Sequence, residues 1–457
     1  MKTINKRILL LIGITAIFLA VVALLLFSMI SNADEYAMKS VNKHIYAHNI
    51  LTNAGDIVDV NGKILATTSD GERVYNDSTS VRAAMLHIIG DNKGFIAGGI
   101  QDTFSSELSG YSLLYGVNNK SVNTLQLTLD AELCAYAYEQ LNPYKGTIAV
   151  CNYKTGELIC LATSPSYDMY NKPSDIDTNS NYDGIYINRL YGGLYTPGSI
   201  FKIVTAMSAI ENISDIYTRT FSCNGSCVLS DGGKIICNDT HGKITFEQAL
   251  NRSCNVAFSQ IAEELGSEKL SDAFSAAGLD KSHNTTDRIK SYKGSFGAKS
   301  DSSATNTGWA GIGQSSTLVN PYSFLTYICA IANGGSSIEP HFIGTVKNAD
   351  GKTIYSAKQI DSGININPTT AATLKTMLRT TVSDYYGDYR FGELKMCGKT
   401  GTAENDNEKP HAWFAGFSAD EDFPYAVIAV LENSGKGLTY AGTAASNVMQ
   451  KLYKTVN

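Results

Sequence analysis

The chain has 457 residues, which is too long for one compact domain and indicates two or three. With 43% apolar and 18% charged residues it can bury a large core, and this composition excludes a disordered chain, a collagen-like repeat and a long coiled coil. The net charge of −6, without a basic block, argues against nucleic acid as a partner, and nine cysteines are too few for a disulfide scaffold. A mean hydropathy of −0.10 excludes a protein with many membrane spans.

One apolar segment runs from Ile8 to Ile30 without a charged residue, and a helix of that length spans the ~30 Å hydrocarbon core of a bilayer. Basic residues precede it and acidic residues follow it, which predicts a cytoplasmic N-terminus and an extracytoplasmic remainder. A small-residue site at 31–33 makes a cleaved signal peptide the alternative. Because the apolar segment is longer than a usual signal core, we expect residues 1–33 to form a cytoplasmic tip and a permanent membrane anchor.

Residues 34–124 carry short β-like segments joined by glycine turns, and Asn61-Gly62 between two of these segments is a strong hairpin signal. We interpret this part as a small α+β module next to the membrane. The larger domain is expected to occupy residues 125–457.

The larger domain is expected to begin and end with strands and to carry helices between them. Strand-like segments lie at 146–151, 157–162, 395–403, 411–418 and 424–431. Helices are expected at 199–212, 245–265, 320–333, 368–385 and, at the end of the chain, 443–454. Strands at both ends of the domain imply one antiparallel sheet that is completed by segments distant in sequence, and hence an α+β fold.

Three short motifs carry the candidate chemistry, and each recurs, so the context must select among the copies. S-x-x-K occurs at Ser40 and again at Ser199 with Lys202. Ser199 follows Pro197 and Gly198 and opens an apolar helical segment, which places its hydroxyl where free backbone N–H groups stabilise negative charge. Lys202 lies one turn away, and burial would lower the pKa of its ammonium group so that it can act as a base. We interpret Ser40 as an ordinary helix start.

The second motif, S-x-N, is selected at Ser253 and Asn255, which lie within helical sequence. Their side chains can face one cavity only if the helix breaks there, and an ordinary helix cap is the alternative. The similar pair that begins at Ser222 enters a glycine-rich loop and is rejected.

The third motif, K-T-G, is selected at Lys399, Thr400 and Gly401, in the middle of a strand-like segment. Glycine inside a strand indicates close approach by a ligand or another segment. The lysine would hold a substrate carboxylate, and the threonine hydroxyl would hydrogen-bond to it. The other copy, at Lys154, is interpreted as a hairpin tip.

Taken in this order, the three motifs resemble those of the penicillin-binding proteins and serine β-lactamases. Other segments narrow the resemblance to class B penicillin-binding proteins: 155–168, 195–202, 311–314, 398–403 and 411–417. The resemblance extends over roughly residues 124–453. It implies a transpeptidase domain built on a five-stranded antiparallel sheet with helices on both faces.

Upstream, residues 54–66 and 87–91 are similar to the N-terminal pedestal of that family. The arginine that is usual before the pedestal glycine is absent, and the stretch between the two segments is short. Both departures indicate a small member with a reduced pedestal. They put in doubt the contacts with partner proteins that larger members make through a head insertion.

The resemblance implies that Ser199 attacks the carbonyl of the penultimate D-Ala of a peptidoglycan stem peptide and that D-Ala leaves. Lys202 is then the base, and Ser253 relays a proton to the leaving amine. The backbone N–H groups of Ser199 and Thr402 would form an oxyanion hole, each donor typically contributing about 3 kcal/mol in the transition state. An amine acceptor gives a cross-link, water gives a D,D-carboxypeptidase side reaction, and β-lactams acylate the same serine.

By the same resemblance, Asn255 would bind the substrate backbone amide, while Lys399 and Thr400 hold the terminal carboxylate. Gly401 and Thr402 continue the strand beside which an extended peptide could add. The resemblance also implies a polytopic glycan-strand polymerase, of the shape, elongation, division and sporulation family, as a membrane partner.

The resemblance requires no cofactor and no metal. Cys223, Cys227, Cys237 and His241 raise the question of zinc, but the spacing of these ligands is irregular, and we do not expect a metal site. A disulfide within that loop and free or structural thiols, including Cys254, stay open as alternatives.

Two other functions compete with the transpeptidase. A β-lactamase needs a base for deacylation, and the sequence offers no candidate. A non-catalytic sensor of β-lactams or wall fragments, or a scaffold, is disfavoured because all three motifs are intact and no transmitter domain is evident.

Overall fold

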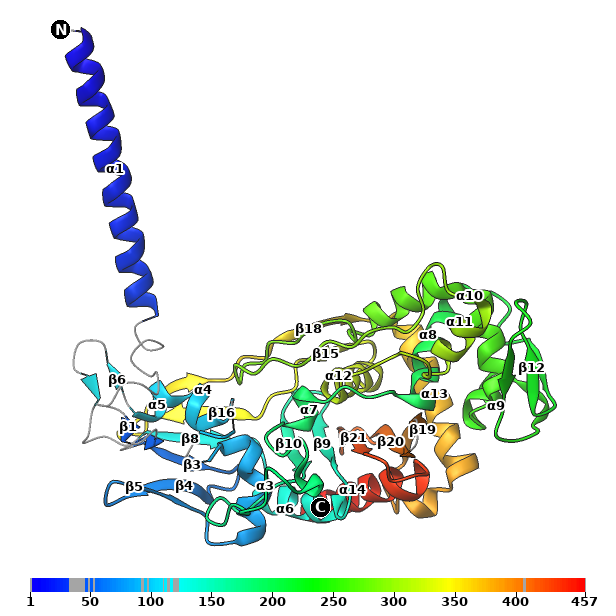
Figure 1. The fold of residues 1–457 in the computed structure, drawn as a ribbon. Coiled ribbons are helices and arrows are strands. Elements are labelled where there is room, and N and C mark those ends of the chain that lie inside the picture. The colour runs from blue at the N-terminus through cyan, green and yellow to red at the C-terminus, as the bar shows by residue number, and fades with distance from the viewer. Residues whose placement is uncertain are drawn as a thin grey trace.

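The computed structural model describes residues 2–32, 46–47, 50–51, 54–91, 94–96, 98–109, 111–112, 116–117, 123–405 and 408–456. Helix α1 (Lys2–Ser31) projects from the rest of the molecule as a single long rod (Figure 1). Within the described residues, Asn5–Ser31 is the one helix long and apolar enough to cross a membrane, and its most apolar window has no residue buried against the protein. This finding agrees with the predicted single-pass anchor.

A six-stranded sheet with the order β17-β16-β8-β3-β4-β5 forms the core of the N-terminal module. Its strands are β3 (Asp56–Val58), β4 (Ile64–Ser69), β5 (Glu72–Tyr75), β8 (Thr124–Leu127), β16 (Ile343–Lys347) and β17 (Thr353–Ser356). The predicted Asn61-Gly62 hairpin joins β3 and β4, which pair antiparallel. The smaller elements of this part are α3 (Thr79–Ile89), α4 (Ile100–Thr103), α5 (Ser105–Ser109), β1 (Tyr46–Ala47), β2 (Ile50–Leu51), β6 (Tyr111–Ser112) and β7 (Gly116–Val117).

The six-stranded sheet takes strands from both sides of the boundary that we expect after residue 124. Strand β8 pairs parallel with β3 and antiparallel with β16, so the chain returns to this sheet more than 200 residues after it has left it. The division at residue 124 stays a prediction about domains. The sheet itself does not end at this boundary. Strand β16, from the larger domain, forms its backbone hydrogen bonds within the six-stranded sheet.

The second sheet is antiparallel and has the order β10-β9-β21-β20-β19. Its strands are β9 (Gly146–Asn152), β10 (Leu158–Ser164), β19 (Met396–Asn405), β20 (Glu408–Ser418) and β21 (Tyr425–Leu431). The prediction of one antiparallel sheet built from the two ends of the domain is therefore confirmed. Helix α12 (Pro321–Ala332) packs on one face, and α6 (Ala131–Leu141) and α14 (Thr443–Val456) pack on the other.

Helices and short hairpins fill the sequence between the two halves of that sheet. The helical elements are α7 (Arg189–Gly192), α8 (Lys202–Asn212), α9 (Phe246–Asn251), α10 (Asn255–Ala276), α11 (Ala304–Gly311) and α13 (Pro368–Thr380), with the short turns η1 (Ser180–Tyr182), η2 (Gly198–Phe201), η3 (Thr381–Tyr386), η4 (Asp388–Arg390) and η5 (Leu438–Gly442). Three two-stranded antiparallel sheets pair β11 (Thr220–Cys223) with β14 (Gly242–Thr245), β12 (Ser226–Val228) with β13 (Lys234–Ile236), and β15 (Ser336–Ile338) with β18 (Asp361–Asn365). The hairpin around β12 and helix α9 lie at the end of the molecule opposite α1 (Figure 1).

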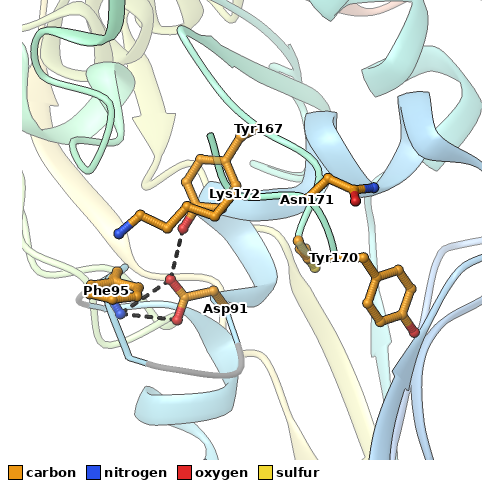
Figure 2. Close-up of a pocket in the computed structure, with 7 residues that line it drawn as sticks. Asp91, Phe95, Tyr167, Tyr170, Asn171 and Lys172 are labelled. Atoms are coloured by element: carbon orange, nitrogen blue, oxygen red, sulfur yellow. Dashed lines mark hydrogen bonds between the residues drawn. The ribbon is translucent and has the colours of Figure 1, made fainter. Parts of the chain in front are cut away.

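The junction between the N-terminal module and the larger domain contains a pocket of about 450 Å³ that is partly open to solvent (Figure 2). Across it the Tyr167 hydroxyl donates to Asp91 Oδ2 at 3.0 Å, and the backbone N–H of Phe95 donates to Asp91 Oδ1 at 3.0 Å. The ammonium group of Lys172 lies 3.4 Å from the centre of the Phe95 ring. These contacts join the segment after α3 to the segment after β10, which lies in the larger domain.

Candidate active site

Ser199 lies in the tight turn η2, directly before α8, and its side chain is partly exposed. The preceding Gly198 has a φ of +56°, and a Cβ at this position would lie 2.8 Å from the carbonyl oxygen of Thr402. The N–H of Gly198 donates to the carbonyl of Gly313 at 2.8 Å. A residue without a side chain is therefore needed here, because the turn that carries Ser199 packs directly against strand β19.

Lys202 is fully buried, and its ammonium group faces Ser199 from the first turn of α8. Nζ donates to Ser199 Oγ at 3.1 Å, to the carbonyl of Ser253 at 2.7 Å and to Asn255 Oδ1 at 2.7 Å. Burial, together with the charge of Lys399, lowers the pKa of Lys202 to about 7. A lysine with such a pKa is neutral in a large fraction of molecules at physiological pH and can accept a proton from a neighbouring hydroxyl.

The single helix expected over 245–265 is interrupted at Ser253, which is the condition stated above for both side chains of the motif to face one cavity. Helix α9 ends at Asn251, α10 begins at Asn255, and Ser253 between them has a φ of +56°. The break turns the Ser253 hydroxyl toward Lys202 Nζ, at 3.2 Å, and Asn255 Nδ2 donates to the carbonyl of Ile236 at 3.0 Å. Both side chains of the motif therefore meet the same lysine.

Strand β19 brings the third motif to the opposite side of Ser253. The buried Lys399 donates from Nζ to Ser253 Oγ at 3.1 Å and to the carbonyl of Thr400 at 3.1 Å. Burial lowers the pKa of Lys399 to about 7. A Cβ on Gly401 would lie 2.5 Å from the carbonyl oxygen of Pro197, which is the close approach predicted for a glycine inside this strand.

Tyr386, at the end of η3, is a member of the site that the sequence analysis does not identify. Its hydroxyl accepts from the N–H of Thr400 at 3.1 Å, lies 2.9 Å from Thr400 Oγ1 and accepts from Lys399 Nζ at 3.5 Å. No motif contains this tyrosine, so only the packing of η3 on β19 identifies it.

The same contact shows which backbone groups β19 presents at its outer edge. The N–H of Thr400 points away from β20 because it donates to Tyr386, and the N–H of Thr402, two residues further along the strand, points the same way. Strand β19 stands at one end of the strand order. An extended peptide could therefore pair with this edge of the sheet.

The alternative copies of the motifs lie elsewhere. Lys154 is at the tip of the hairpin between β9 and β10, and Ser222 is within β11. Ser40 lies outside the described residues. Trp413 donates from Nε1 to the carbonyl of Thr196 at 3.0 Å, a contact that helps to hold the turn before Ser199.

The described cysteines are all free thiols, and the set that we considered for zinc differs from the set that the fold assembles. Cys223, Cys237 and His241 lie together, and the fourth member of this group is Cys254 rather than Cys227. Cys254 comes from the S-x-N turn, outside the loop that contains Cys227.

A family model described as the penicillin-binding protein transpeptidase domain matches residues 146–454. The peptidoglycan D,D-transpeptidase PbpA of Mycobacterium tuberculosis is 26% identical over 321 residues, which cover 66% of this chain and 65% of that relative. The stage V sporulation protein D of Bacillus subtilis is 23% identical over 401 residues, covering 84% of this chain and 59% of that relative. The chain thus spans less than two thirds of the length of these curated relatives.

Solved structures share the fold. The D,D-transpeptidase domain of a peptidoglycan glycosyltransferase from Eggerthella lenta is 25% identical, with a TM-score of 0.76 over 88% of this chain and 99% of that one. Penicillin-binding protein A of M. tuberculosis, as a penicillin G acyl-enzyme complex, is 20% identical, with a TM-score of 0.75 over 88% and 99% of the two chains. Since the family model alone covers more than half of the sequence, the chain belongs to the penicillin-binding proteins with a transpeptidase domain, and its likeness to PbpA and to stage V sporulation protein D places it among those of class B.

Proposed function

We propose that this protein is a serine-type peptidoglycan D,D-transpeptidase that cross-links stem peptides and is acylated by β-lactams. The observation that carries the proposal is the 3.1 Å contact between Lys202 Nζ and Ser199 Oγ. It joins a partly exposed hydroxyl to a buried amine whose pKa is lowered to about 7. This pairing can activate a serine without a histidine.

In the proposed acylation step, neutral Lys202 takes the proton of Ser199 as Oγ attacks the carbonyl carbon of the penultimate D-Ala. The negative charge that develops on the carbonyl oxygen is stabilised by the N–H groups of Ser199 and Thr402. When the peptide bond breaks, a proton reaches the departing D-Ala amine through Ser253. The position of Ser253 Oγ, 3.2 Å from Lys202 Nζ and 3.1 Å from Lys399 Nζ, supports this relay.

The substrate is held by residues around that relay. Charged Lys399 and the hydroxyl of Thr400 are proposed to bind the terminal carboxylate, and Gly401 leaves room for the peptide backbone beside β19. Asn255 Nδ2 carries two N–H donors, of which one bonds to the carbonyl of Ile236, so the other can bind a substrate carbonyl. In deacylation an amine from a second stem peptide attacks the ester carbonyl and gives a proton to Lys202. The new C–N bond forms as the bond to Ser199 Oγ breaks, and Lys202 returns that proton to the departing Ser199 oxygen.

Acylation by fluorescent penicillin tests this function. The purified full-length protein should label with one equivalent, Ser199→Ala should not label, and Ser222→Ala, which alters a rejected motif copy, should label like the parent. Failure of the parent to label would contradict the serine acyl-transfer mechanism. Loss of the label within minutes would instead favour a β-lactamase.

A synthetic stem pentapeptide ending in D-Ala-D-Ala separates the transpeptidase from a sensor that is merely acylated. The parent should release D-Ala and form a cross-linked dimer when an acceptor amine is present, with some hydrolysis by water. A protein that labels with penicillin but releases no D-Ala would support the sensor.

The apolar helix within α1 supports a single-pass membrane protein, and we propose that its N-terminus is cytoplasmic and its remainder extracytoplasmic. The positive charges before the helix support this orientation. We further propose that the helix and the N-terminal module contact a polytopic glycan polymerase. Replacing residues 8–30 by an unrelated membrane helix should abolish co-purification of the polymerase while penicillin labelling persists, and unchanged co-purification would contradict the contact.

A further inference from the structure

Three thiols and one imidazole converge beside the S-x-N turn. Cys223 closes β11, Cys237 follows β13, His241 precedes β14, and Cys254 lies between α9 and α10. One ligand atom from each residue lies within 4.8 Å of every other. The three cysteines are buried, whereas the histidine is partly exposed. Three segments of the chain, namely the end of β11, the loop between β13 and β14, and the turn before α10, thus deliver four potential metal ligands to one point.

The spacing of these atoms is close to that of a tetrahedral metal centre. With Zn–S bonds of about 2.3 Å and Zn–N bonds of about 2.0 Å, tetrahedral geometry places two sulfurs about 3.8 Å apart and a sulfur and a nitrogen about 3.5 Å apart. Cys237 Sγ lies 4.0 Å from Cys254 Sγ and 3.6 Å from His241 Nδ1. Small movements of the side chains would therefore suffice to bind one ion.

We propose that Cys223, Cys237, His241 and Cys254 bind one Zn²⁺ ion. Three thiolates and an imidazole form a soft, closed ligand set of the kind that structural zinc sites use. The surroundings suit thiolate sulfurs, because the N–H of Asn255 donates to Cys237 Sγ at 3.3 Å and the N–H of Ala257 donates to Cys254 Sγ at 3.4 Å. The irregular spacing in sequence is no obstacle, since the ligands are supplied by the end of β11, the loop between β13 and β14, and a helix break.

A disulfide explains this arrangement less well. Joining Cys237 to Cys254 would bring their sulfurs from 4.0 Å to about 2.05 Å and would leave Cys223 and His241 beside the bond without a role. Three thiols cannot all pair with one another, whereas one metal ion uses all four side chains.

The ion would hold the turn that carries two residues of the active site. Cys254 stands between Ser253 and Asn255, and Ser253 has a φ of +56°, a backbone conformation that non-glycine residues rarely adopt. An ion that binds Cys254 together with the other three ligands would hold this turn in place. The zinc site would then position Ser253 and Asn255 against Lys202, and it would take no part in the chemistry itself.

The metal content of the full-length protein, purified in detergent with a thiol reductant, tests the proposal. We expect one zinc per chain by elemental analysis. The Cys223→Ser and Cys254→Ser variants should bind at least fivefold less zinc than the parent. The matched control is Cys227→Ser, in the same hairpin region but outside the cluster, and it should retain the parent value. Less than one tenth of an equivalent in the parent, even after equimolar Zn²⁺ is added, would overturn the proposal, as would an equal loss in Cys227→Ser.

Cobalt substitution keeps the test decisive if a cysteine variant does not fold. The parent and Cys227→Ser, loaded with Co²⁺, should show the visible bands of tetrahedral cobalt and a thiolate-to-cobalt charge-transfer band. In His241→Ala, which changes a partly exposed residue, the visible bands should shift. An octahedral cobalt spectrum, or none, in the parent would overturn the site.

The positioning role has its own readout. Removal of zinc with a chelator should slow penicillin acylation at least tenfold, and Zn²⁺ but not Mg²⁺ should restore it. Acylation that is unchanged after complete removal of zinc would overturn this role. Zinc content is measured independently of labelling, so a zinc-loaded protein that never labels would contradict the transpeptidase function and leave the metal site standing.

Discussion

The junction between the two parts of the molecule and the active site both bury positive charge, but they do so in opposite ways. At the junction, Arg82 of α3 donates to Asp168 from Nε at 2.6 Å and from Nη2 at 2.9 Å. In the active site, neither Lys202 nor Lys399 lies within 4.0 Å of a carboxylate in the part of the chain that the structure describes. Their ammonium groups are bound by neutral oxygens alone.

The pKa values follow this difference. The hydrogen bonds from Arg82 hold the pKa of Asp168 down at about 2, so both partners stay charged. Burial lowers the pKa values of Lys202 and Lys399 to about 7, and the charge of Lys399 contributes to the lowering for Lys202. A paired buried charge holds two segments together, whereas unpaired amines remain available for proton transfer and for an anionic substrate.

Substitution of Lys202 should have the largest effect and should act on chemistry alone. The Lys202→Met variant is expected to acylate with penicillin about 10³-fold more slowly, the range typical for loss of a general base. Its melting temperature should not fall, because a buried amine without a carboxylate partner costs desolvation energy. The acylation rate of the parent should rise through pH 7, where Lys202 loses its proton, and stopped-flow labelling between pH 5.5 and 8 should show no such rise in the variant.

Substitution of Arg82 should show the reverse pattern. The Arg82→Met variant leaves Asp168 buried without its partner, and we expect the free energy of unfolding to fall by about 3 kcal/mol. Denaturant titration measures this change. Penicillin acylation of the folded variant at low temperature should match that of the parent.

A double variant provides the control for Arg82. Replacing Asp168 by leucine in the Arg82→Met background should recover part of the lost stability, because no unpaired charge is then buried. A double variant less stable than Arg82→Met alone would contradict the assignment of the loss to an unpaired carboxylate.

The buried His87 extends the comparison to a group that is kept neutral. Its Nε2 donates to the carbonyl of Ile185 at 2.6 Å across the junction, and burial lowers its pKa to about 4. The unfolded chain then binds more protons than the folded one between pH 4 and 6.5, so stability is present above pH 6.5 and is lost as the pH falls. These values predict that the free energy of unfolding falls by about 2 kcal/mol between pH 7 and pH 5.

The His87→Phe variant isolates this effect from other acid-sensitive groups. Denaturant titrations at pH 7 and pH 5 give the free energy of unfolding at each pH. In the variant the difference between these two values should be smaller than in the parent by most of that ~2 kcal/mol. An unchanged pH dependence in the variant would assign the acid sensitivity to other groups.

Several features were predictable from the sequence because local signals specify them. The apolar helix, the five strands of the antiparallel sheet and most of the main helices follow from residue periodicity and turn chemistry, and the structure has them near the predicted positions. The single helix expected over 245–265 is instead α9 and α10, which are separated by the turn at Ser253. Thr245 forms a capping box with Gln248 at the start of α9, a local sequence signal of this kind. The predicted helix over 368–385 is instead α13 followed by the π-helical turn η3, because the helical hydrogen bonding changes after Thr380.

Only the tertiary structure decided which distant side chains meet. The three motifs identify Ser199, Ser253 and Lys399, but their contacts around Lys202 require α8, α10 and β19 to pack together. The sequence carries no signal for Tyr386 and none that brings Cys254 of the S-x-N turn next to Cys223, Cys237 and His241. The physical reason is that backbone periodicity reports the secondary structure within a segment, whereas a site between segments depends on the packing of surfaces far apart in the chain.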